Sequence, residues 1–373
     1  MALDFLSGIR VVDLSQYIPG PYATLLLSDQ GAEVVKVERP GGEPMRSGFG
    51  PDGADGISPF YKVLNGGKTI VELDLKADDG CANFLALLES ADVLLESFRP
   101  GVMQRLGFGP DVLRARFPSL VICSLSGYGQ TGPYRLRAGH DINYLALAGM
   151  LSSTGTTESP VTPFPPVSDY AGGMQAVISI LCALMGRVTT GDGAYLDVSL
   201  SESVLGWQSA SLSNIAHAGY SLAPGDGNES GGRADYRTYR TSDGRFVSLG
   251  AEEIKFWENF CNVVERPDWI SQHRAPVPQT ALVAEVAALF ETQTFSYWRA
   301  LLEDCDCCFE AVWEHHELGD HPQLVARQLI SPEQWTDSMT QVLYPAWTNG
   351  VPPDRRPEAL YSEVSVVLSK WQG

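Results

Sequence analysis

The first third of the chain alternates short apolar runs with segments of helical apolar spacing, and this alternation limits the possible folds more than any other feature. A helix is expected from Pro21 to about Gly31 and another at about 79–90. The expected strands are 9–14 (IRVVDL), 33–38 (EVVKVE), 70–75, 93–95 and 120–125. Strands that alternate with helices favour an α/β fold with a mostly parallel sheet and right-handed crossovers. Ligands of such sheets bind at the carboxyl ends of the strands.

The later part of the chain has a different pattern. A long apolar helix is expected at 169–187, and its composition predicts that it is buried. The Gly-, Asp- and Ser-rich stretch 223–233 is the best linker candidate. After it, two strand-like runs joined at Ser242-Asp243-Gly244 predict a hairpin, and helical patterns follow at 255–303. We therefore predict a large domain at 1–222 and a smaller α+β domain at 223–325.

The charge balance excludes several classes of partner. Lys and Arg total 26 and Asp and Glu total 45, so the formal net charge is −19. Such a surface repels nucleic acids and anionic membranes, but it allows a small phosphorylated ligand bound by a few local basic residues. The N-terminal residues lack the pattern of a signal peptide, and no apolar stretch approaches the roughly 20 residues of a membrane span. Seven cysteines do not indicate a disulfide framework, so we expect a soluble, cytoplasmic protein.

Thiols and imidazoles gather near the end of the small domain, where they could form a metal site. The residues concerned are Cys305, Cys307, Cys308, His315, His316 and His321. Zinc ligands usually have a C-x₂₋₄-C spacing and converge tetrahedrally, whereas this pattern is C-x-C-C followed by two adjacent histidines. We therefore expect no metal at these residues. The sequence also contains no GxGxxG motif and no P-loop.

Three titratable residues are candidates for chemistry. His140 is followed by Asp141 at the start of an apolar segment, Asp169 opens the long apolar helix, and Glu253 follows the turn after a strand. Polar groups that enter a buried element are costly unless they are paired or used. The residues alone do not decide between a catalytic role and a structural one. His140 with Asp141 is also compatible with a helix cap, and Asp169 is compatible with an ordinary N-cap.

Seven segments together resemble the class III CoA-transferase superfamily, which includes carnitine-CoA transferases and α-methylacyl-CoA racemases. They contain the strings VVDLSQYIPGPYATLLLSDQGAEVVKVERPGG, NGGKTIVELDLK, ESFRPGVMQRLGFG, AGHDINY, SDYAGG, TGDGAYLDVSL and YRTYRTSDGRFVSLGAEE, in the order of the family. The AGHDINY string is similar to the racemase branch, where a histidine stands at the position of His140. That branch has an aspartate and a glutamate at the positions of Asp169 and Glu253. Transferases generally keep only the aspartate, as a nucleophile.

The resemblance also implies an architecture. It predicts a Rossmann-like large domain, a small domain, and a C-terminal segment (326–373) that returns to the large domain. Two chains are expected to interlink as a homodimer, with the active site between one subunit's large domain and the other's small domain. Coenzyme A is expected to lie along the large domain. The implied contacting residues are Arg39, Leu73, Lys76, Phe98, Arg105, Leu106, Arg137 and Asp141.

The chemistry implied for the racemase branch is proton transfer at the α-carbon of a 2-methylacyl-CoA. Inversion needs an acid/base group on each face of that carbon, and His140 and Asp169 fill these roles while Glu253 orients the imidazole. The start of the helix at Asp169 would offer backbone N–H groups to the thioester oxygen. Two alternatives stay open: CoA transfer to a carboxylic acid through attack by Asp169, and CoA binding without catalysis. The stretch 152–166 and the tail 329–373 depart from the family pattern, so the acyl group is not implied.

Overall fold

The computed structural model describes residues 4–156, 158–221, 223–331 and 339–372. The chain forms two compact units, each described here by itself. Unit 1 comprises 1–148, 164–207 and 319–373, and unit 2 comprises 149–163 and 208–318.

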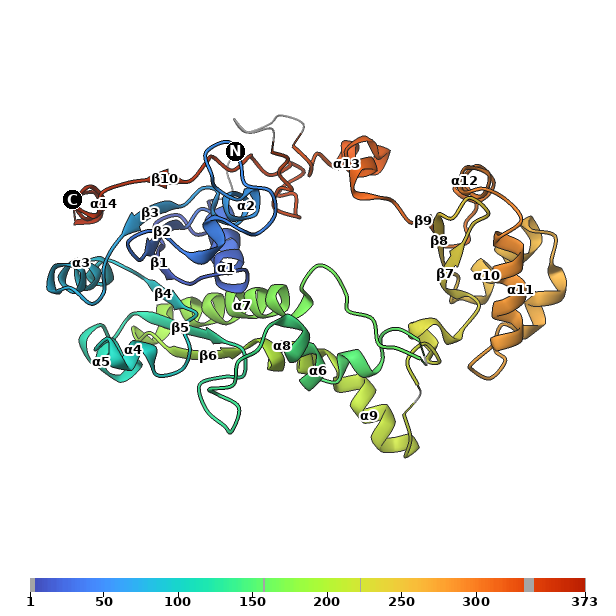
Figure 1. Ribbon diagram of the computed structural model, residues 1–373, viewed down its shortest axis with the longest axis horizontal. Coiled ribbons are helices and arrows are strands. Elements are labelled where there is room, and N and C mark those ends of the chain that lie inside the picture. The colour runs from blue at the N-terminus through green and yellow to red at the C-terminus, as the bar shows by residue number, and fades with distance from the viewer. Residues whose placement is uncertain (1–3, 157, 222, 332–338, 373) are drawn as a thin grey trace. The chain divides into compact units, whose positions relative to one another are not determined.

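Unit 1 is built on a seven-stranded parallel sheet with the order β10-β3-β2-β1-β4-β5-β6 (Figure 1). Its strands are β1 (Arg10–Leu14), β2 (Glu33–Glu38), β3 (Thr69–Glu72), β4 (Val93–Glu96), β5 (Val121–Ser126), β6 (Tyr195–Ser199) and β10 (Leu360–Tyr361). The α/β fold expected from the sequence is therefore confirmed. The predicted third strand extended too far, because pairing with β2 ends at Glu72 and the chain then turns through Asp74, whose carbonyl accepts the N–H of Ala77 at 3.0 Å.

Helices cover both faces of this sheet. Val11, Val34 and Val93 pack on one face with α1 (Pro19–Asp29), α6 (Asp141–Leu147) and α7 (Val167–Thr190). The next residue along each of these strands packs on the other face, whose helices are α3 (Asp78–Glu89), α5 (Pro110–Arg116) and α14 (Val364–Gln372), and α4 (Val102–Arg105) adds Met103 to that core. A sheet covered on both faces explains why each of these strands has apolar residues at consecutive positions. The remaining helices of unit 1 with α-helical geometry are α2 (Pro59–Asn65), α8 (Leu200–Trp207) and α13 (Pro322–Arg327).

Helix α7 differs from its prediction in two respects. It has 24 residues, and by length and composition alone it is the one helix in the described part of the chain that could cross a membrane, although no such stretch was expected from the sequence. It was also predicted to be buried, yet Met174 is 49% exposed and Val188 is 88% exposed. Its apolar composition is only partly explained by packing, because one stripe through Ala176 and Ile180 contacts the core while the opposite stripe faces outward.

A buried charge network holds the connection between β1 and α1 at the carboxyl edge of the sheet. Lys68 Nζ lies 3.3 Å from Asp13 Oδ2 and donates to the carbonyl of Pro21 at 2.9 Å. Asp13 also accepts the N–H of Ser15 at 2.8 Å, and the Lys36 ammonium donates to the carbonyl of Ser15 at 2.8 Å. Burial alone would raise the pKa of Asp13, but Lys36 and Lys68 outweigh it and lower that pKa to about 2.

This network predicts the effect of Lys68→Met on stability. Removing one partner of a buried ion pair leaves the other charge poorly compensated, so the free energy of unfolding should fall by about 3 kcal/mol in a urea titration. The matched control, Arg116→Met, removes a half-exposed pair with Glu89 and should change it by less than about 1 kcal/mol. Because the pKa of Asp13 is depressed in the folded state, its stabilisation is complete above the ordinary value of 3.8 and is lost as the pH falls through about 2. Equal effects of the two variants would contradict this role of Lys68.

Unit 2 contains a small antiparallel sheet of β7 (Tyr236–Arg240), β8 (Phe246–Gly250) and β9 (Phe309–Ala311). The predicted hairpin is confirmed, since β7 and β8 pair on either side of the expected turn. Helices α10 (Ile254–Val263), α11 (Thr280–Phe290) and α12 (Phe295–Leu302) pack on the sheet around Trp257, Trp269 and Trp298, which are buried. Helix α9 (Ser209–Ala218) also belongs to this unit but has no buried residue.

The compact units and the predicted domain ranges differ at their edges. Residues 149–163 and 208–222 fall in unit 2 rather than in the first range, and 319–325 fall in unit 1. One cause is visible at Gly225, whose Cα lies so close to Gly155 that a Cβ there would be 3.0 Å from the Gly155 carbonyl. The predicted linker 223–233 thus packs against the stretch 149–163. The C-terminal residues lie in unit 1, where β10 pairs with β3.

Candidate active site

His140 and Asp169 lie at the N-terminal ends of two helices of unit 1. His140 is exposed and directly precedes α6, and its backbone N–H donates to Asn143 Oδ1 at 3.0 Å. Asp169 is the third residue of α7, whose N-cap residue is Pro166. The interpretation of Asp169 as an N-cap is therefore wrong, because α7 begins two residues earlier than the apolar pattern suggested.

The carboxylate of Asp141 joins these two helix ends. Its Oδ1 accepts the N–H and the hydroxyl of Ser168, both at 2.6 Å, and the N–H of Asp169 at 3.2 Å. Asp141 thus caps α7 and not the helix to which it belongs, because a carboxylate beside a helix N-terminus satisfies N–H groups that lack partners within the helix. The N–H groups that were expected to be offered to a thioester oxygen are already used by Asp141. That expectation is wrong for Ser168 and Asp169.

Asp169 is poised to exchange protons near neutral pH. Burial first, and then repulsion by the Asp141 charge, raise the pKa of Asp169 to about 7. Beside it, burial and the charge of Asp169 raise the pKa of Tyr144 to about 12, so the Tyr144 hydroxyl stays protonated and donates to the carbonyl of Gly139 at 2.7 Å. This bond fixes the chain immediately before His140. Perturbed carboxyl groups of this kind are frequent at catalytic sites.

Two glycines allow the tyrosines to pack closely around this segment. Tyr128 and Tyr144 make an edge-on contact with ring centroids 5.0 Å apart. A Cβ at Gly139 would lie 2.8 Å from the Tyr128 hydroxyl, and a Cβ at Gly127 would lie 2.5 Å from the Tyr144 ring. Any larger residue would displace a ring, so both glycines serve to bring the backbone against the aromatic pair.

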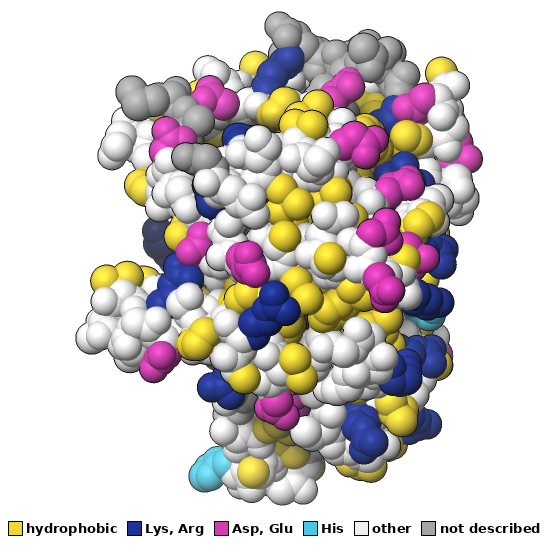
Figure 2. Space-filling model, turned by 90° about the vertical axis from the view of Figure 1, so that its left-hand side faces the viewer, with side chains coloured by type: hydrophobic (Ala, Val, Ile, Leu, Met, Phe, Trp, Pro, Cys, Tyr) yellow, Lys and Arg dark blue, Asp and Glu magenta, His cyan; other side chains and the backbone are white. Residues whose placement is uncertain are grey.

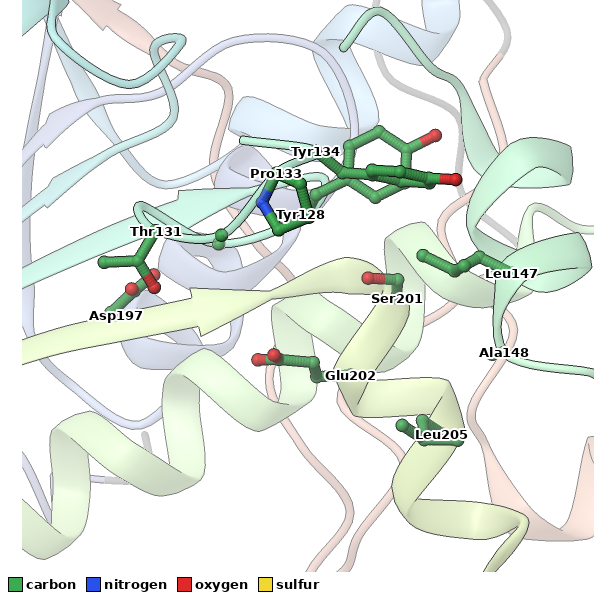
Figure 3. A pocket seen from close by; sticks show the side chains of 12 residues that line it. Tyr128, Thr131, Pro133, Tyr134, Leu147, Ala148, Asp197, Ser201, Glu202 and Leu205 are labelled. Carbon is green, nitrogen blue, oxygen red and sulfur yellow. The ribbon is translucent and has the colours of Figure 1, made fainter. Parts of the chain in front are cut away.

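A cavity of about 460 Å³ opens beside the Tyr128 ring within unit 1 (Figure 3). Its apolar lining includes Tyr134, Leu147 and Leu205, and its polar lining includes Asp197 and Glu202, with no Lys or Arg among the lining residues. Figure 3 shows the two carboxylates on the side of β6 and α8, below the tyrosine and proline rings. The cavity is therefore suited to a neutral, apolar group rather than to an anion.

The residues implied to contact coenzyme A lie mainly after neighbouring strands of the sheet. Arg39 follows β2, Leu73 and Lys76 follow β3, and Phe98, Arg105 and Leu106 follow β4. Because these strands are parallel and adjacent or nearly so, the residues share the carboxyl edge where ligands of such sheets bind. Arg137 is placed elsewhere, after β5, and lies over the Tyr134 ring at 4.1 Å.

These residues differ in exposure. Arg39, Lys76, Arg105 and Arg137 are exposed and available to phosphates. Leu73 is buried, whereas Phe98 and Leu106 are half-buried at the border of the core. Figure 2 shows Lys and Arg side chains gathered in the lower half of the face that carries α4 and α5, in spite of the negative net charge. Arg105, Arg114 and Arg116 are exposed on these helices.

Glu253 lies in unit 2, at the N-cap position of α10 and directly after the turn that ends β8. Cys308 is near enough for the Glu253 charge to contribute, after burial, to raising the pKa of its thiol. The structure thus brings His140, Asp141 and Asp169 together in unit 1 and places Glu253 on a separate unit. Within the described ranges, no group of three or more His, Cys, Asp or Glu side chains could hold a metal ion, and all seven cysteines are free thiols.

Sequence reasoning missed Ser168, Tyr144 and Tyr128 as parts of the site. Tyr144 lies inside the AGHDINY string, and Ser168 directly precedes Asp169, so both were within matched segments. Nothing in the sequence indicated that Asp141 bonds to Ser168, since the two residues are separated by 26 others and meet only in the fold.

The comparisons with known proteins identify the family of this chain. The model of CoA-transferase family III matches residues 6–359. The chain is 36% identical to the human α-methylacyl-CoA racemase over 330 residues, which are 85% of this chain and 80% of that protein. It is 30% identical to the human succinyl-CoA:glutarate CoA-transferase over 336 residues, 87% of this chain and 75% of that protein. A CaiB/BaiF family protein from Brucella suis, 24% identical, has the same fold with a TM-score of 0.84 over 98% of this chain and 99% of that chain. The chain belongs to CoA-transferase family III.

Proposed function

We propose that this enzyme racemises 2-methylacyl-CoA thioesters by removing the α-proton on one face and returning a proton on the other. The observation that carries the proposal is the junction of α6 and α7. There Asp141 bonds to the backbone of Asp169 at 3.2 Å, while His140 is the residue before Asp141. His140 and Asp169, which can both act as acid and base, thus lie at one hydrogen-bonded junction of two helices.

The pKa of Asp169 supports proton transfer by this residue. With a pKa raised to about 7, the carboxyl group is protonated in about half of the molecules at neutral pH, so it can deliver a proton or accept one. In one direction the imidazole of His140 removes the α-proton while Asp169 delivers one to the opposite face, and in the other direction the roles are exchanged. Glu253 is proposed to orient the imidazole in an assembled homodimer, as a carboxylate orients a catalytic histidine in other enzymes.

Transfer of CoA to a carboxylic acid is the alternative, with Asp169 attacking the thioester carbonyl. The likeness to the human succinyl-CoA:glutarate CoA-transferase favours it. Two observations weigh against it. An attacking carboxylate must be ionised, and Asp169 with a pKa of about 7 is ionised in only about half of the molecules at neutral pH. The cavity beside Tyr128 also carries Asp197 and Glu202, which repel a second carboxylate such as that of a dicarboxylic acceptor.

Binding of the substrate is proposed to use the carboxyl edge of the sheet. Arg39, Lys76 and Arg105 would hold the phosphates of coenzyme A, and the apolar cavity beside Tyr128 would accept an acyl chain. No further cofactor and no metal is proposed. We also propose a cytoplasmic homodimer.

The proposal is tested by incubating one enantiomer of a 2-methylacyl-CoA with the enzyme in the absence of any carboxylic acid. A racemase converts it to a mixture of both enantiomers, which chiral chromatography resolves. If the enantiomer persists, while added carboxylic acids receive CoA in a labelled-acid assay, the enzyme is a transferase.

Asp141→Asn should shift the pH dependence of racemisation to lower pH. The amide oxygen of asparagine can still accept the N–H groups of Ser168 and Asp169, but the negative charge that helps to raise the pKa of Asp169 is lost. The pKa of Asp169 should therefore fall, by about 1 unit. In the pH–rate profile, one limb reports Asp169 acting as a base and the other reports it acting as an acid. Both limbs should move to lower pH. Asp111→Asn, an exposed control on α5, should leave both limbs in place, and an unmoved or upward-shifted profile for Asp141→Asn would contradict the assignment.

A further inference from the structure

Unit 2 contains a buried ion cluster that none of the proposed catalytic groups belongs to. Arg233 and Asp235 form a bidentate ion pair, in which Arg233 Nε donates to Asp235 Oδ1 at 2.7 Å and Arg233 Nη2 donates to Oδ2. His273 Nε2 lies 2.9 Å from the same Oδ2. The side chains of Arg233, Asp235 and His273 are 6%, 2% and 2% exposed.

The backbone around the pair is fixed on several sides. Gln279 Oε1 accepts the N–H of Ala234 at 3.0 Å, and the N–H of Gln279 donates to the carbonyl of Gly232 at 2.8 Å. The Tyr239 hydroxyl donates to the carbonyl of Ala234 at 2.6 Å. Residues 232–235 are therefore held by the side chain of Tyr239 on β7 and by the side chain and backbone of Gln279 before α11.

This fixed segment contacts the turn that carries Glu253. The carbonyl of Asp235 accepts the N–H of Ala251 at 2.7 Å. The remaining guanidinium nitrogen, Arg233 Nη1, faces Glu252 Oε1 at 3.7 Å, and the Glu252 side chain is 47% exposed. On the other side of the turn, the N–H of Gly250 donates to the carbonyl of Cys308 at 2.9 Å. Two bonds and one ion pair thus set the path of residues 250–253.

A buried ion pair is a weak source of stability, because removing both charges from water costs about as much as their attraction returns. Such a pair therefore contributes more to holding the neighbouring backbone in one conformation than to the free energy of unfolding. Here the geometry concerns two adjacent carboxylates, Glu252 and Glu253, which repel each other unless one is neutralised. Arg233 Nη1 is the positive group that faces Glu252 at 3.7 Å. Lys255 and Asp306, whose charges act with that of Glu253 on Cys308, form an exposed pair at 3.8 Å.

We propose that Arg233 and Asp235 are positioning residues for Glu253. Their buried pair holds the turn 250–253 through the Asp235 carbonyl, and Arg233 draws Glu252 away from Glu253 so that the Glu253 carboxylate is free to face the imidazole. This inference rests on the proposed role of Glu253 in racemisation.

The test is a double-mutant cycle on the full-length enzyme with a single 2-methylacyl-CoA enantiomer. Arg233→Gln and Glu252→Lys should each lower kcat by about tenfold or more, because misplacement of a supporting group by about 1 Å costs up to about a hundredfold. KM should change by less than about threefold, since neither residue is proposed to bind substrate. Glu252 is at the surface, so Glu252→Lys should keep the wild-type melting temperature even if Arg233→Gln does not.

The two effects should not multiply. The Glu252→Lys substitution acts by placing a positive charge against Arg233, and this repulsion is absent once Arg233 is replaced. The double variant should therefore lose no more activity than Arg233→Gln alone. Two independent sites would instead give losses that multiply. Arg266→Gln is the matched control, because Arg266 forms an exposed pair with Asp268 and Glu285 in the same unit and should leave kcat unchanged.

The outcomes separate this inference from the proposed function. Multiplied losses, or wild-type kcat in Glu252→Lys, would overturn the positioning role while racemisation by the wild type stands. A wild type without racemase activity would overturn the proposed function and with it this inference. A fully active Glu253→Gln variant would overturn the role of Glu253 and this inference, while racemisation stands. Hydrogen exchange gives a readout without substrate: the amide of Ala251 should exchange faster in Arg233→Gln and at the wild-type rate in Arg266→Gln.

Discussion

Asp169→Asn should lower the rate of racemisation by between about 10² and 10⁴-fold, the contribution typical of a positioned general acid or base. Asparagine has the shape of aspartate but neither gives nor takes a proton at neutral pH. The backbone N–H of residue 169 and the Ser168 contacts to Asp141 remain, so the start of α7 and the binding of coenzyme A should be unchanged. Chiral chromatography gives the rate, and calorimetric titration with coenzyme A gives the binding.

The variant also has a stereochemical signature. In D₂O, His140 should still remove the α-proton from one enantiomer and return a deuteron to the same face, so that enantiomer gains deuterium without inversion. The other enantiomer should gain none. Asp192→Asn, an exposed control in the turn after α7, should behave as the wild type. Full racemisation by Asp169→Asn would remove Asp169 from the chemistry.

His140→Ala should lower the rate of racemisation by a similar factor, about 10² to 10⁴-fold, with the opposite stereochemical result. Asp169 remains, and its pKa of about 7 allows it to remove the α-proton from the enantiomer that Asp169→Asn leaves untouched. The His140 side chain is exposed at the surface of unit 1 and has no core to disrupt, so the melting temperature should not change.

His217→Ala is the control for this histidine, since His217 is also exposed on a helix, α9, and is not part of the proposed site. Mass spectrometry of each enantiomer after incubation in D₂O separates the possibilities. If both variants exchanged the same enantiomer, the two residues would not act on opposite faces, and a mechanism with one base would replace the one proposed here.

The sheet and the hairpin could be predicted because their signals are local. Strands covered on both faces have apolar residues at consecutive positions, and the predicted 93–95 lies within β4 for that reason. The turn Ser242-Asp243-Gly244 likewise marks the hairpin by its own residues, with Gly244 at a φ of +81° that favours glycine. Both features depend on residues close together in the chain.

The candidate site could be predicted only in part, because its geometry depends on contacts between distant residues. No local pattern indicates that the carboxylate of Asp141, which is expected to contact coenzyme A, caps a helix that begins at Val167. The outward face of α7 also escaped prediction, because an apolar stripe such as that of Met174 and Val188 has the same composition whether it is covered or exposed. Resemblance predicted His140 and Asp169 as reacting residues, whereas the contacts around them could be seen only in the fold.

The most direct test of the account follows both deuterium and chirality at the α-carbon. Wild-type enzyme is incubated in D₂O with (S)-2-methylacyl-CoA and no carboxylic acid, and the two enantiomers are separated at early times. The account predicts deuterium in the newly formed (R) product and little in the recovered (S) substrate, because different groups remove and return the proton. If neither enantiomer gains deuterium, and carboxylic acids supplied in a separate incubation receive CoA, the enzyme is a transferase and the racemase proposal is wrong.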